Sequence, residues 1–507
     1  MLKKYFEQNV ERVSFYLLIY TFLICSQGIY LFGNDLIEIL PFLKKIGHPE
    51  LYVNDFYIQS AWNKPLFERS VFIYLLHFLH AENAIVRLLL HLLISLFLIH
   101  ATFKLCCLII ENKFYCYWAV FLYFVISSRI SLGGNEIYYN SLLPSLVAKT
   151  FVLYALLYYT KEKFLYSFLF LSIATFLQAA VGFQLWLLLG ILSMILFQFK
   201  SSTFRSFAKS YFIFGFISLL YLLALYYFSN SNPSLSQYLF EIQEFRNGHH
   251  LIVEYSSLLN IIIYLFFVLF SLLFYYKSNS IFYYFTLVQF TILILYVLLT
   301  SVFHFYSVFN LFWLKSSIYI EFFAFFGLIA FLTNTKRFNY FQLTKHRHIL
   351  PILICILSLV FSIKKKVNFI NESTSEITIS ELIKTKTEPN SIFLAPPDFT
   401  SFKFLSERNS YIDFKAILQD PNYLFPWYDR IQNFYQINYN NRIQGDNLIQ
   451  KSKENFNNRL WAEHIANLQS KSIDYIIVEK QTKASNSLHS IKSPVIKNDR
   501  YEVFQLK

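Results

Sequence analysis

Long apolar runs separated by short polar stretches dominate the first 366 residues of the chain. A run of about 18 or more apolar residues can cross a hydrocarbon layer of ~30 Å as a helix. The pattern therefore predicts about eleven transmembrane helices. The expected spans cover residues 13–32, 83–110, 114–128, 142–159, 164–178, 182–199, 211–228, 258–276, 281–301, 313–332 and 349–363.

From about residue 367 the pattern changes to short apolar runs between helix-like stretches. The apolar runs predict buried strands at 391–395, 411–414, 474–478 and 501–506. The stretches between them predict helices at 377–386, 398–407, 423–437 and 454–470. Strands that alternate with helices indicate a small α/β layer with some parallel pairing.

Two domains are therefore expected. Residues 1–366 are predicted to form a polytopic α-helical membrane domain with a long first outer loop, 33–82, and a second outer loop, 229–257. Residues 367–507 are predicted to form a C-terminal α/β domain.

Composition supports the membrane class. The chain is 56% hydrophobic and 15% charged, whereas soluble domains are usually ~25% charged. All five cysteines lie in or beside predicted spans, so no disulfide framework or CxxC metal site is expected. The chain has no Walker loop, GxGxxG or GxSxG motif, which disfavours a cytoplasmic enzyme that uses nucleotides.

The net charge of +13 is better explained by membrane topology than by nucleic acid. Lysine and arginine gather in short loops that alternate along the chain, and such loops usually face the cytoplasm. This pattern predicts a cytoplasmic N-terminus and, after eleven spans, an extracytoplasmic C-terminal domain. Lys364–Lys366 departs from the rule, and losing one span would reverse the C-terminal side.

Three carboxylates on the predicted outer side are candidates for acid–base chemistry: Asp35, Asp55 and Glu136. Asp55 lies among aromatic residues, and apolar surroundings raise the pKa of a carboxyl toward the working pH of a general base. The alternative for Asp35 and Asp55 is a turn or a helix cap, where most loop aspartates occur. Glu136 follows two glycines that allow close approach of a ligand, or simply a chain reversal.

Arg246, His249 and His250 form the densest ionisable cluster between two apolar runs. A guanidinium grips two phosphate oxygens in a planar fork, and histidine titrates near neutral pH. The alternative is a solvated loop. Two adjacent histidines supply at most two metal ligands, so no metal site and no cofactor are predicted. Use of a divalent metal remains an alternative.

Arg87, Lys149 and Lys315 lie just inside the outer ends of predicted spans. Ionisable groups within a bilayer usually face a polar cavity, but near a helix end they can instead extend to the interface. Lys149 lies deepest and therefore favours a cavity. Together with the outer carboxylates, these cations suit an anionic lipid phosphate beside a general base.

Four segments resemble a family of bacterial polytopic membrane proteins that end in a domain of unknown function and are related to the GT-C glycosyltransferases. The segments are Leu51–Tyr57, Leu132–Ile137, Phe245–His250 and a tail stretch from Ile392 to Arg430 that includes Trp427-Tyr-Asp-Arg430. The resemblance extends over most of the chain, but the motifs are short.

The resemblance implies many spans, a first outer loop with a catalytic aspartate, and a sugar donor linked to polyprenyl phosphate. By this resemblance Asp35 or Asp55 is the general base, Glu136 a second acidic group, and Arg246, His249 and His250 bind the lipid phosphate. Gln178 departs from the pattern, because such relatives often have histidine there. A functional role for that position in the family would predict an inactive chain here.

These observations predict an inner-membrane glycosyltransferase that moves a sugar from a polyprenyl-phosphate donor to a cell-envelope acceptor. Two alternatives remain open: a lipid-binding or assembly protein that kept the fold without the chemistry, and a transporter of a lipid-linked intermediate. A transporter is expected to show broken helices and paired half-repeats, and the chain shows no duplicated pattern.

Overall fold

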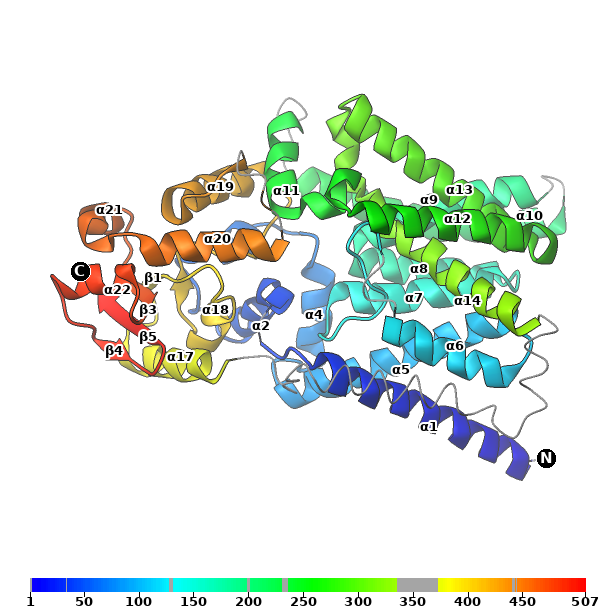
Figure 1. The fold of residues 1–507 in the computed structure, drawn as a ribbon, viewed down its shortest axis with the longest axis horizontal. Coiled ribbons are helices and arrows are strands. Elements are labelled where there is room, and N and C mark those ends of the chain that lie inside the picture. Colours follow the sequence, from blue (N-terminus) through cyan, green and yellow to red (C-terminus); the bar gives the residue numbers. More distant parts are fainter. Residues whose placement is uncertain are drawn as a thin grey trace. The chain divides into compact units, whose positions relative to one another are not determined.

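The fold comes from a computed structural model of the chain, which describes residues 2–32, 34–126, 131–197, 201–229, 236–334, 373–439, 443 and 445–507. Its residues divide into two compact units (Figure 1). The membrane unit comprises Met1–Ile29, Leu88–Leu222 and His249–Phe369. The C-terminal unit comprises Tyr30–Arg87, Leu223–Gly248 and Ile370–Lys507.

This division differs from the one expected from sequence. The loop at 33–82 and part of the loop at 229–257 belong with the C-terminal segment rather than with the membrane helices. Aromatic residues explain the grouping of the first loop, because Phe56 stacks on Tyr423 with ring centroids 4.8 Å apart. Loop and C-terminal segment therefore share one core.

Helices occupy the membrane unit at each of the ten positions expected before residue 335. They are α1 (Leu2–Gln27), α5 (Ala84–Ile109), α6 (Lys113–Ile126), α7 (Pro144–Tyr159), α8 (Phe164–Leu177), α9 (Ala179–Leu196), α10 (Ser202–Phe228), α12 (Leu258–Ser278), α13 (Ser280–Val297) and α14 (Ile318–Asn334). A π-helical turn, η5 (Leu298–Val302), extends α13, and the 3₁₀ turns η6 (Tyr306–Leu311) and η7 (Trp313–Ser317) precede α14.

Six stretches of described helix are long and apolar enough to cross a membrane, so the chain is a membrane protein. They include α5, α9, α10 and α12 and the stretches Ser280–Val302 and Val308–Thr333, while α6 and α8 are shorter apolar helices. The predicted count of about eleven spans is not confirmed. The expected span at 349–363 lies outside the described residues.

The C-terminal unit contains a five-stranded sheet of order β2-β1-β3-β5-β4. Its strands are β1 (Ile392–Leu394), β2 (Asn409–Ser410), β3 (Tyr475–Glu479), β4 (Ile496–Lys497) and β5 (Tyr501–Gln505). β1 pairs in parallel with β2 and β3, whereas β5 pairs antiparallel with β3 and β4. No strand forms at the expected position 411–414; the short strand β2 lies just before it and ends at Ser410.

Helices of this unit surround the sheet, and α17 (Thr374–Lys386) contacts β4 while α22 (Lys483–His489) contacts β3 (Figure 1). Ile379 and Ile383, one helical turn apart, are fully buried and share a core with Phe393, Ile477 and Val503. The other elements are η1 (Asn34–Glu38), α2 (Leu40–Gly47), α3 (Phe56–Trp62), α4 (Ser70–Phe78), α11 (Ser236–Leu251), η4 (Val253–Tyr255), α18 (Phe402–Ser406), α19 (Pro421–Tyr435), α20 (Gly445–Asn458), η9 (Trp461–His464) and α21 (Ile465–Ser470). α11 crosses the boundary between the units, and η4 belongs to the membrane unit.

Candidate functional site

A charged cluster lies at the end of η1 in the C-terminal unit. Glu38 forms an ion pair with Arg69, and their side chains are 13% and 22% exposed. The hydroxyl of Tyr57 donates to the backbone carbonyl of Glu38 at 3.3 Å, which fixes the turn. Burial raises the pKa of Glu38 to about 7; the positive charge of Arg69 opposes this rise, and the negative charge of Asp35 adds to it. A carboxyl that titrates near neutral pH suits a general base.

The guanidinium of Arg246, on α11, uses few of its hydrogen-bond donors within the protein. Its Nη1 donates to Asn247 and its Nη2 to the carbonyl of Lys415, both at a long 3.4 Å. Its Nε is buried and has no hydrogen-bond partner. Burial lowers the pKa of this guanidinium, while the charges of Glu38 and Asp35 raise it. No described carboxylate lies within 4.0 Å of it, so this cation can receive an anionic ligand.

Asp35 and Arg246, both expected from sequence, therefore belong to one electrostatic neighbourhood, which we call the Glu38 cluster: Asp35, Glu38, Arg69 and Arg246. Asp35 is exposed at the first turn of η1, three residues before Glu38, so both carboxylates lie on one helical turn.

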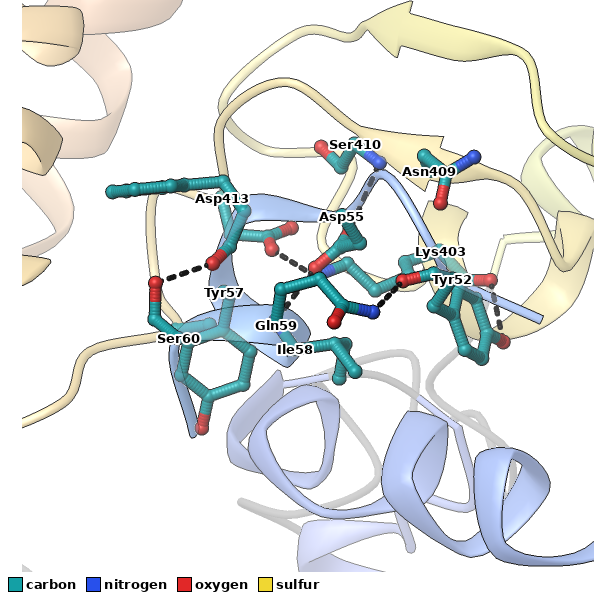
Figure 2. Close-up of polar contacts among 12 residues, drawn as sticks. Tyr52, Asp55, Tyr57, Ile58, Gln59, Ser60, Lys403, Asn409, Ser410 and Asp413 are labelled. Atoms are coloured by element: carbon teal, nitrogen blue, oxygen red, sulfur yellow. Dashed lines mark hydrogen bonds and ion pairs between the residues drawn. The ribbon is translucent and has the colours of Figure 1, made fainter. Parts of the chain in front are cut away.

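Asp55 has a different environment (Figure 2). It is fully buried at the N-cap of α3, where its Oδ1 accepts from the backbone N–H of Ile58 at 2.8 Å and from Lys403 Nζ at 2.7 Å. Its Oδ2 accepts from the backbone N–H of Ser410 at 3.0 Å. Lys403 also pairs with Asp413. Asp55 thus ties the first loop to the C-terminal segment, with both oxygens engaged.

The buried triad of Asp55, Lys403 and Asp413 contains two carboxylates and only one amine. Burial favours the neutral amine of Lys403, but the two carboxylates outweigh burial and raise its pKa. Burial raises the pKa of Asp413 to about 6, and the charge of Lys403 opposes that rise. The protein donors on both oxygens favour a structural role for Asp55, and its role as a base stays a proposal.

In the membrane unit, the turn before α7 packs closely against the last residues of α11. His250 Nδ1 lies 2.5 Å from the carbonyl of Gly133, and the rings of His249 and His250 lie 3.9 Å apart. Gly134 has φ +57°, a conformation that favours glycine, and a Cβ there would lie 2.8 Å from the His249 ring. The structure thus brings two of the expected histidines to the expected Gly-Gly turn.

Lys149 holds the same turn from α7. Its Nζ donates to Asn135 Oδ1 at 2.6 Å, to the Tyr139 hydroxyl at 3.1 Å and to the backbone carbonyl of Glu136. All three N–H donors of this buried amine are therefore used inside the protein. The Glu136 side chain is only partly buried, and burial raises its pKa while the charge of Lys149 lowers it.

Two further expected cations have defined surroundings. Lys315 lies in η7 with its Nζ 5.0 Å from the centre of the Phe312 ring. Arg87, in the C-terminal unit, is 2% exposed and donates to the carbonyls of Ala81 and Glu82 at 2.8 Å and of Leu31 at 3.0 Å. These three hydrogen bonds to backbone carbonyls indicate a structural role for Arg87 at the start of α5.

Substitution of Gly133 by alanine is expected to destabilise the membrane unit. A Cβ at Gly133 would lie 2.5 Å from the backbone of Leu314, which cannot move aside as a flexible side chain does. We expect Gly133→Ala to cost roughly 1–3 kcal/mol, the usual range for overpacking. Gly47→Ala is the matched control, because nothing lies within 4 Å of its added Cβ. Equal thermal stability of the two purified variants would contradict this packing.

Sequence reasoning did not single out Glu38, Arg69, Lys403 or Asp413. Glu38 follows Asp35 by three residues, a spacing that places both on one helical turn and offered a signal. Arg69, Lys403 and Asp413 gave none, because their roles depend on partners distant in sequence. Gln178 is the N-cap residue of α9, and its Oε1 is buried without a hydrogen-bond partner.

A metal has no evident place among the described residues. No group of three or more His, Cys, Asp or Glu side chains is arranged there to hold an ion. In the Glu38 cluster, one of the two carboxylates is already paired with Arg69.

Comparison with solved structures defines the class of fold. The chain matches the Archaeoglobus fulgidus oligosaccharyltransferase in complex with zinc and sulfate with a TM-score of 0.52 and 12% identity, over 92% of this chain and 68% of that chain. The same enzyme tethered by a disulfide to an acceptor peptide with an NVT sequon gives a TM-score of 0.47 and 10% identity, over 92% and 69%. The first match shows that the chain shares its fold with this oligosaccharyltransferase.

At the level of sequence, residues 374–434 match the family described as a domain of unknown function, DUF6798. This stretch holds α17, β1, α18, β2 and most of α19. Comparison with curated proteins gives no match.

Proposed function

We propose that the protein is a membrane glycosyltransferase that moves a sugar from a polyprenyl-phosphate-linked donor to a cell-envelope acceptor. The observation that carries the proposal is Arg246, a guanidinium with unused donors in the same cluster as a carboxyl that titrates near pH 7. The oligosaccharyltransferase-like fold supports it. We place the reaction at the outer face of a bacterial inner membrane.

The proposed step needs a base and an anion acceptor. The oxygen of the acceptor hydroxyl bonds to the sugar C1, its proton passes to Glu38, and the bond from C1 to the phosphate oxygen breaks. The electron pair of that bond stays on the departing polyprenyl phosphate, where Arg246 neutralises it. Asp35 keeps Glu38 basic by its negative charge.

The membrane unit supplies the remaining candidates. Within the membrane unit, His249, His250 and Lys315 stay proposed contacts for a phosphate, as expected from the sequence. Glu136 stays a proposed second acidic group, since its carboxylate is partly exposed and forms no ion pair with a described cation. We assign Lys149 and Arg87 to positioning rather than to the lipid phosphate, because the Lys149 amine and both Nη groups of Arg87 already bind protein carbonyls and side chains.

Removal of the guanidinium is expected to weaken donor binding. A hydrogen bond to a charged group contributes about 1.5–3 kcal/mol, so Arg246→Ala is predicted to raise the Kd for a polyprenyl-phosphate sugar by roughly 10- to 100-fold. The measurement is titration of the donor into purified protein in lipid nanodiscs. Arg205→Ala is the control, because Arg205 is exposed on α10. Equal affinity of the two variants would exclude Arg246 from the donor site.

The rate of transfer is expected to depend on pH through Glu38. A base must be unprotonated, so the rate is predicted to fall as the pH drops through about 7, the pKa of Glu38. Asp35→Asn removes a negative charge that raises this pKa, and it should therefore move the acidic limb to lower pH. The pH profiles of kcat/KM for wild type and Asp35→Asn test this, and a limb that stays in place or moves upward would contradict it.

A further inference from the structure

A hollow with both polar and apolar lining lies between the first loop and the C-terminal segment, within the C-terminal unit. It has a volume of about 420 Å³, and its lining includes Asn54, Phe56, Gln59, Tyr411, Arg430 and Lys471. This size is in the range of ordinary small-molecule sites. We call it the Arg430 pocket.

Arg430, on α19, is held rigidly at this pocket. Its Cζ lies 3.8 Å from the centre of the Phe56 ring and 4.2 Å from that of Tyr411. Phe56 in turn stacks on Tyr423, so the stacking partner of the guanidinium is itself fixed. A guanidinium oriented by stacking loses little side-chain entropy when it binds a ligand.

The donors of Arg430 are largely unused. Nη1 donates to the carbonyl of Tyr411, and no described carboxylate lies within 4.0 Å of the guanidinium. Burial lowers the pKa of Arg430, which reflects a cation held away from water without a direct counter-ion. The remaining N–H groups can form a forked contact with an oxyanion.

The accessible charge of the pocket is positive. Lys471 is exposed at its lining and forms no ion pair with a described residue. Asp55 also lines the pocket, but its side chain is fully buried and forms an ion pair with Lys403. The carboxamides of Asn54 and Gln59 add neutral groups suited to hydroxyls, and Phe56 adds an apolar surface.

From these contacts we propose that the Arg430 pocket binds a small hydroxylated molecule that carries an oxyanion, namely a sugar with a carboxylate or a phosphate. Arg430 and Lys471 contact the oxyanion, while Asn54 and Gln59 contact hydroxyl groups. This site is separate from the proposed transfer reaction and does not depend on it, because binding here requires no donor lipid and no turnover.

The test is titration of full-length protein in nanodiscs with glucuronic acid, glucose 6-phosphate and glucose, followed by saturation-transfer NMR and calorimetry. We expect at least one of the two charged sugars to bind at least tenfold more tightly than glucose. Preference for glucuronic acid identifies a carboxylate ligand, and preference for glucose 6-phosphate identifies a phosphate ligand. Failure of both to bind more tightly than glucose would overturn the proposal.

Variants locate the site. Arg430→Gln is expected to lower affinity for the charged sugar at least tenfold, and Lys471→Glu, on the exposed lining, should do so without disturbing the core. Lys483→Glu makes the same charge change on the exposed start of α22, outside the pocket, and should bind as wild type does. Thermal unfolding of each variant checks its fold. If Lys471→Glu binds as tightly as Lys483→Glu, the Arg430 pocket is not the site.

Discussion

Glu38→Gln is expected to lower the turnover of sugar transfer by about 10²- to 10⁴-fold, the usual contribution of a general base. Glutamine keeps the size of the side chain and can still accept a hydrogen bond from Arg69, but it cannot take up the acceptor's proton. Donor affinity is predicted to change little, because the base does not contact the leaving phosphate. The measurement is single-turnover transfer with saturating donor.

The matched control for Glu38→Gln is Glu50→Gln. Glu50 belongs to the same loop, but its side chain is 68% exposed and its contact is with the equally exposed His48. Turnover of Glu50→Gln should stay within about twofold of wild type, as expected for a substitution far from the reacting atoms. Equal turnover of the two variants would show that Glu38 is not the general base.

Lys403→Met is expected to destabilise the C-terminal unit by about 3–5 kcal/mol, the usual effect of removing one partner from a buried ion pair. The Lys403 and Asp55 side chains are both 0% exposed, and Asp413 is 7% exposed. Methionine fills the space but leaves two carboxylates buried together without a counter-charge. The free energy of unfolding can be measured by pulse proteolysis of the full-length protein in urea.

Two variants sharpen this test of the buried triad. Lys451→Met removes an ion pair whose partners are 49% and 48% exposed, and it should cost no more than about 1 kcal/mol. Replacing all three members, with Lys403→Met, Asp55→Asn and Asp413→Asn, removes the unpaired charges and should recover part of the stability lost in Lys403→Met alone. If Lys403→Met were as stable as Lys451→Met, the triad would not hold the unit together.

The helices and most of the sheet could be predicted from the sequence, because local patterns encode them. The run 258–276 coincides with α12, and Asp474–Val478 coincides closely with β3, whose central residues are fully buried. β4 was not predicted, since its two residues, Ile496 and Lys497, pair with β5 without an apolar run of their own. Local pattern therefore fails where pairing alone defines a strand.

The candidate site was predicted only in part, for a physical reason. Asp55 looks like an available loop carboxylate, but its counter-ion Lys403 lies 348 residues further along the chain. Glu38 looks ordinary in sequence, and its raised pKa arises from burial and from the charge of Asp35, against the opposing charge of Arg69. Chemistry that depends on burial and on distant partners cannot be deduced from spacing.

The most direct test of the proposed function is transfer by the purified wild-type protein in nanodiscs. A polyprenyl-phosphate donor with a labelled sugar is mixed with cell-envelope acceptors, and both the labelled product and the released polyprenyl phosphate are counted. We predict that the two appear in equal amounts and that both are lost in Glu38→Gln. If the donor binds tightly to wild type but stays intact with every acceptor, the protein is not a transferase. That result would favour a lipid-binding protein instead.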